Sequence, residues 1–89
     1  MSVAIAKLAD RFTETEIDDE IVVMQLDTGD FFSLTGTSTT IWRLIDGTRD
    51  RPALIADLCA EFGAVEAEVA ADVDEFLGKL RGAGLLGPG

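Results

Sequence analysis

The stretch LDTGDFFSLTGTSTTIWRLIDG, residues 26–47, contains the point at which the hydrophobic pattern of this chain changes its period. Up to Leu34 the residues are typical of a strand that follows a turn at Thr28-Gly29. Beyond Leu34 the apolar residues recur at helical spacing: Ile41, Trp42 and Ile45. The stretch therefore predicts a strand over residues 30–34 and then a helix, which Thr35 or Thr37 caps and Gly47 ends.

Two further strands are predicted upstream. Residues 11–18 alternate in the period of two that is typical of a half-exposed strand, and Asp18-Asp19 then indicates a turn. Residues 20–27 begin with Ile-Val-Val after one glutamate, as expected of the middle strand of a small sheet. Three consecutive strands joined by short turns predict an antiparallel meander, in which the first and third strands are the edges.

Two further helices are predicted downstream. Asp50 and Pro52 are suited to the start of a helix that Gly63 ends. A third helix is predicted from about Val65 to Ala83, because apolar residues recur there at intervals of three and four. The expected fold class is α+β, a winged-helix-like domain with a three-stranded antiparallel sheet followed by three helices. One domain is expected over residues 1–89, with loose termini at 1–10 and 87–89.

Composition limits the chemistry of the chain. It has 89 residues, a formal net charge of −10, no histidine and one cysteine, Cys59. A lone cysteine without histidine predicts no metal site, and no cofactor is expected. The clustered Lys and Arg that drive nucleic-acid binding are missing, so no nucleic-acid partner is expected. No apolar run approaches a membrane span and the N-terminus does not resemble a secretory signal, so the expected location is cytoplasmic.

The two predicted edge strands differ in charge. The first carries Glu14 and Glu16, the kind of edge charges that discourage pairing with a foreign strand. The third has no charge, proline or glycine between Phe31 and Leu34, so its backbone is a template for another extended chain. Period two predicts that Phe32 and Leu34 face the helices, while Phe31 points the other way.

The order of these segments resembles PqqD-like proteins, the peptide-recognition domains (RiPP recognition elements) of pathways that modify ribosomally made peptides. The resemblance covers roughly residues 20–86, and its most specific pieces are Ile41-Trp42 with Leu44-Ile45-Asp46-Gly47, and DVDEFLGKLRGAGLL over residues 72–86. One departure is Thr35, where the family commonly has asparagine. The resemblance implies a non-catalytic peptide chaperone that binds the leader of a precursor peptide by strand addition beside the third strand. It also implies delivery of that leader to a modifying enzyme, such as a radical SAM enzyme or a leader peptidase.

Positions carried over from the family give the candidate peptide-binding residues. The third strand would supply Phe31, Phe32, Ser33 and Leu34. The third helix would supply Val69, Asp72, Val73, Phe76 and Leu80. Val73, Phe76 and Leu80 fit a core stripe as well as a binding groove. Trp42 is expected to be structural, because a large aromatic on the inner face of a helix usually fills the core.

Other functions remain open from the residues alone. A winged-helix fold is compatible with DNA binding, although the third helix is acidic where a recognition helix would be basic. An acidic protein-interaction module is a further alternative, and an acyl carrier would need Ser38 to hold its prosthetic group. Catalysis by the chain itself is not expected, since it lacks a paired base and nucleophile.

Overall fold

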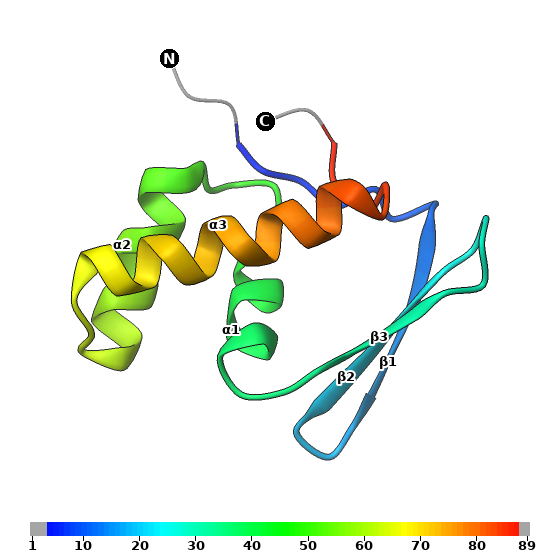
Figure 1. Cartoon of the computed structure of the whole chain (residues 1–89), viewed down its shortest axis with the longest axis horizontal. Coiled ribbons are helices and arrows are strands. Elements are labelled where there is room, and N and C mark those ends of the chain that lie inside the picture. The colour runs from blue at the N-terminus through cyan, green and yellow to red at the C-terminus, as the bar shows by residue number, and fades with distance from the viewer. Residues whose placement is uncertain (1–3, 88–89) are drawn as a thin grey trace.

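The structure, a computed structural model, describes residues 4–87. A three-stranded sheet is followed by three helices (Figure 1), which confirms the predicted fold class. In chain order the elements are β1 (Phe12–Ile17), β2 (Glu20–Gln25), β3 (Phe31–Leu34), α1 (Thr37–Leu44), α2 (Arg51–Phe62) and α3 (Glu66–Gly82).

The sheet is an antiparallel meander in the order β1-β2-β3, so β1 and β3 are its edges. The turn between β1 and β2 places Asp18 at a φ of 56°, and the turn before β3 places Gly29 at a φ of 77°. Asparagine, aspartate and glycine are the residues that tolerate this left-handed backbone. Both turns predicted from the sequence are therefore confirmed.

The helix boundaries follow local sequence signals in α2 and depart from them in α1. The Asp50 side chain accepts a hydrogen bond from the Ala53 N–H at 3.0 Å, and Gly63 ends α2 at a φ of 61°. At α1 the expected threonine cap is wrong, because Gly36 occupies the N-cap position and no side-chain cap bond is formed. The helix ends with Leu44, before Gly47 is reached.

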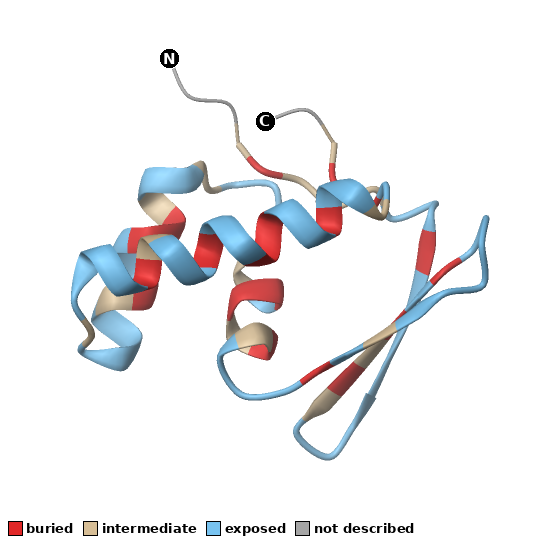
Figure 2. Ribbon diagram, viewed as in Figure 1, coloured by how far each residue is buried: buried red, intermediate tan, exposed pale blue. Residues whose placement is uncertain are grey.

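The core lies where the helices meet each other and the inner face of the sheet, as the buried positions in Figure 2 show. Trp42 is fully buried at its centre, as the sequence predicts. Its ring stacks edge-on with Phe12 at a centroid distance of 5.2 Å, and Lys7 Nζ lies 4.1 Å from the ring centroid. This cluster joins β1 and the N-terminal segment to α1.

The segments next to the termini are more ordered than the sequence indicates. Ile5 is buried in the core, and the Leu8 N–H donates to the Leu85 carbonyl at 2.8 Å. Lys7 also forms a β-bridge with Leu86, so the expectation of a loose segment over 1–10 fails within its described part. Residues 1–3 and 88–89 lie outside the described residues. Among the helices of the described range, none has the length and apolar character needed to cross a membrane.

Candidate peptide-binding edge and groove

The backbone of β3 presents two residues to its free edge. The Gln25 N–H donates to the Asp30 carbonyl at 2.7 Å, so the pair formed by Gln25 and Asp30 is hydrogen-bonded. Bonded and non-bonded pairs alternate in an antiparallel ladder, and the register pairs Val23 with Phe32. The N–H and C=O groups of Phe32 therefore point toward β2. Those of Phe31 and Ser33 point away from it, toward the unpaired side of β3.

The side chains of β3 alternate between the two faces of the sheet. Leu34 is buried, and the half-buried Phe32 packs against the core. Phe31 is 69 % exposed and pairs with Met24 on the outer face, as the period of two predicts. A strand added beside β3 would alternate in the same way, so every second side chain would point toward the helices.

A groove runs between the free side of β3 and α3, and we call it the β3–α3 groove. Its volume is about 170 Å³, and its lining residues are Phe32, Ser33, Leu34, Ser38, Phe76, Lys79 and Leu80. Phe76 and Leu80 are 7 % and 2 % exposed, so they supply an apolar wall while remaining part of the core. The sequence prediction allowed either role for these two residues, and the structure shows that they belong to the core and also line the groove.

Next to the groove along α3 lies a central hollow of about 240 Å³. Ser38, Phe76 and Lys79 line both spaces, so the two adjoin. Asp72 and Glu75 add carboxylates to the hollow, and Glu75 Oε1 lies 3.7 Å from Lys79 Nζ. The hollow therefore has a mixed, net acidic wall on α3.

Two predicted residues of α3 lie elsewhere. Val73 is fully buried and lines none of these spaces within the described residues, so it belongs to the core stripe. Val69 is 6 % exposed and lines a further cavity toward α2. The sequence reasoning did not include Ser38 or Lys79 among the candidate peptide-binding residues. A helical-face argument could have found Lys79, which follows Asp72 and Phe76 at helical intervals on one side of α3.

The glutamates of β1 make contacts to α1 that the sequence did not predict. Glu14 pairs with the buried Val23 and Glu16 with the buried Ile21, so both side chains lie on the inner face of the sheet. Glu14 Oε2 accepts a hydrogen bond from Trp42 Nε1 at 3.1 Å, and Glu16 pairs with Arg43 of α1. They connect the sheet to α1. The sequence signal for their inward direction was their spacing of two and four residues from Phe12, which places all three side chains on one face of the strand.

An ion pair on the surface joins α2 to α3, the helix that forms one wall of the groove. Arg51 Nε lies 2.7 Å from Asp74 Oδ1, and a second bond joins the same two side chains. This bidentate pair lowers the pKa of Asp74 and raises the pKa of Arg51.

No group of three or more metal-ligating side chains occurs in residues 4–87.

The fold and site define a small α+β domain with an open strand edge beside an apolar groove. Residues 20–86 match the protein family described as Coenzyme PQQ synthesis protein D (PqqD). The chain belongs to this PqqD family. No match to the sequence was found among curated proteins.

Two solved structures resemble the chain over nearly its whole length. One is TbiB1 in complex with the TbiA(beta) leader peptide, with 29 % identity and a TM-score of 0.79, covering 97 % of this chain and 94 % of that chain. The other is lasso peptide synthetase B1 complexed with the leader peptide, with 14 % identity and a TM-score of 0.81. That match covers 96 % of this chain and 99 % of the other, and it supports the shared fold.

Proposed function

We propose that this domain binds the leader segment of a ribosomally made precursor peptide as an added strand beside β3. The observation that carries the proposal is the free edge of β3, where Phe31 and Ser33 present their backbone groups next to the β3–α3 groove. Strand addition uses this combination of main-chain bonds and alternate side-chain pockets. Membership of the PqqD family and two similar structures, both described as complexes with leader peptides, support the assignment.

The domain would act as a non-catalytic carrier in the cytoplasm. In this proposal it holds the leader and presents the precursor to a separate modifying enzyme, such as a radical SAM enzyme or a leader peptidase. A DNA-binding role receives no support from α3, whose exposed positions include five acids: Glu66, Glu68, Asp72, Asp74 and Glu75. Phosphate backbones would be repelled from this helix.

A proline substitution tests the edge directly. Ser33→Pro removes an N–H that faces the free side of β3 and leaves the ladder with β2 complete, since Ser33 belongs to a non-bonded pair. The variant should keep the fold and lose about tenfold or more in affinity, because one bond is deleted and the ring clashes with the added strand. The measurement is isothermal titration with the synthetic leader of the precursor encoded beside this gene.

Glu16→Pro is the matched control, because the Glu16 N–H faces the free side of β1, the opposite edge of the sheet. It should bind the leader as the parent does. In the parent, amide shifts on adding the leader should cluster at residues 30–34 and 66–80. Equal losses of leader affinity in the two proline variants would refute strand addition beside β3. Amide shifts concentrated on β1 and α2 would refute it as well.

A further inference from the structure

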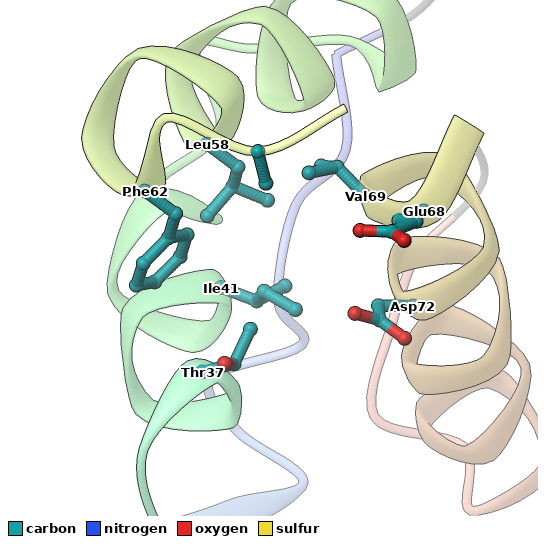
Figure 3. Close-up of a pocket in the computed structure, with 8 residues that line it drawn as sticks. Thr37, Ile41, Leu58, Phe62, Glu68, Val69 and Asp72 are labelled. Carbon is teal, nitrogen blue, oxygen red and sulfur yellow. The ribbon is translucent and has the colours of Figure 1, made fainter. Parts of the chain in front are cut away.

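A cavity between the three helices adjoins the central hollow. We call it the end pocket, and its volume is about 190 Å³. Its walls come from α1, from α2 with the following Ala64, and from the N-terminal half of α3 (Figure 3). Ile41, Leu58 and Val69 are buried there and give it an apolar lining. Phe62 lines the same cavity and is 44 % exposed, so the apolar surface reaches solvent.

The size of the end pocket limits what it can hold. Sites for small molecules and cofactors usually enclose roughly 300 to 1,000 Å³, which is more than this cavity offers. One bulky side chain is a better match for about 190 Å³. The apolar lining selects an aromatic or a branched aliphatic group, because burying such a group there removes apolar surface from water.

The charges at the end pocket select a cation beside that apolar group. Figure 3 shows the Glu68 and Asp72 carboxylates projecting from α3 toward the cavity. No ion pair occupies either carboxylate in the described part of the chain. Carboxylates that border an apolar surface attract an ammonium or guanidinium group more strongly than carboxylates surrounded by water.

The end pocket lies next to the proposed leader site. Thr37, Ile41 and Asp72 line both the end pocket and the central hollow, and the central hollow in turn adjoins the β3–α3 groove. A peptide paired with β3 that continues past Leu34 along α3 therefore reaches the end pocket. Because only two residues of β3 face the free edge, an added strand needs further contacts, and this cavity lies on its path.

We infer that the end pocket is a second anchor for the leader, outside the strand-pairing segment. It takes one bulky apolar side chain that has a Lys or Arg next to it in the peptide sequence. This inference rests on the proposed function, and it adds the chemistry by which the leader is selected.

Small probes test the pocket independently of any leader. Phenethylamine carries an aromatic ring and a cation, and 2-phenylethanol is its neutral counterpart. Both should shift the amides around Ile41, Leu58 and Val69 in a titration of the whole chain, with the amine about two- to fivefold tighter, as for an exposed ion pair. The double variant Glu68→Gln and Asp72→Asn should remove that preference. Equal binding of the two probes to the parent, or no binding at these amides, would overturn the inference.

A cavity-filling variant tests the pocket with the leader itself. Ala64 lines the end pocket, so Ala64→Leu should fill it and weaken leader binding by about tenfold. Ala67→Leu makes the same change at an exposed position of α3 outside the cavity, and it should bind like the parent. Melting curves identify any loss of folding, in which case the double carboxylate variant supplies the leader measurement. Parent-like binding by Ala64→Leu overturns the second anchor while strand pairing stands, whereas failure of the parent to bind the leader refutes the proposed function itself.

Discussion

Replacement of Trp42 by alanine tests the packing on which the groove depends. Trp42 is fully buried and contacts Phe12, Lys7 and Glu14, so the substitution empties the centre of the core. Removing a large aromatic from a core costs about 3 to 5 kcal/mol. The lost hydrogen bond adds little, because Glu14 is exposed and regains water.

The expected loss is large compared with the total stability. At roughly 0.05 to 0.15 kcal/mol per residue, the 89 residues have a free energy of unfolding of about 4 to 13 kcal/mol. A domain of this size loses roughly 4 to 8 °C in Tm per kcal/mol, so Trp42→Ala should lower the Tm by at least about 12 °C. Circular dichroism is the suitable assay, because the variant removes the only tryptophan.

Phe31→Ala is the control for this measurement. Its side chain is 69 % exposed, so the Tm should change by no more than about 4 °C. Trp42→Phe keeps a ring beside Phe12, so its Tm should lie between those of Trp42→Ala and Phe31→Ala. A Trp42→Ala protein that melts within about 4 °C of the parent would refute the placement of this residue, and with it the orientation of α1 that forms the groove.

Two further predictions concern pH and the backbone. Hydrogen bonds from Thr48, together with the nearby Arg49, lower the pKa of Asp46 to about 2. The Asp46 carboxylate therefore contributes fully to stability above a pH of about 4, and this contribution is lost as the pH falls through about 2. At pH 7 the Asp46→Asn variant should therefore melt at a lower Tm than the parent, and this difference should disappear near pH 2. A Tm difference that is the same at both pH values contradicts this role. Gly36 has a φ of 58° and a ψ of −127°, a region nearly restricted to glycine, so Gly36→Ala should cost about 1 to 3 kcal/mol in urea unfolding. Gly63→Asn should cost less because a φ of 61° with a ψ of 28° is tolerated by asparagine, and equal costs would be inconsistent with this account.

Local sequence patterns were sufficient for the element types and for several of the residues that line the β3–α3 groove. Asp50, Pro52 and Gly63 mark α2 because capping depends on a few adjacent residues. The alternation in β3 placed Phe31 outside and Leu34 inside, because side-chain direction in a strand has a fixed period. The open third edge also followed from sequence, since an absence of charged residues can be read directly.

Features that depend on long-range packing could not be predicted in this way. Ile5 lies in a segment without periodicity, and its burial depends on pairing between Lys7 and Leu86 across the whole chain. Lys79 and Ser38 line one groove only because α1 and α3 converge there. The sequence analysis interpreted Glu14 from its charge alone. The face of the sheet on which Glu14 lies follows from its pairing with Val23, and its hydrogen-bond partner follows from the position of Trp42.

The shortness of β3 explains why a strand edge can stay open and still be selective. A four-residue edge strand is itself a protection against unspecific pairing, and the net charge of −10 keeps copies of the chain apart. Phe31 and Ser33 offer roughly four hydrogen bonds, which together contribute about 2 to 6 kcal/mol. Association costs about 4 to 15 kcal/mol, so main-chain pairing alone does not hold a peptide. Each large apolar side chain buried in the groove or the end pocket adds about 1.5 to 3 kcal/mol. In the proposed mode of binding, the backbone of β3 would therefore hold the leader as an added strand, and the side chains buried against α3 would decide which leader is bound and in which register.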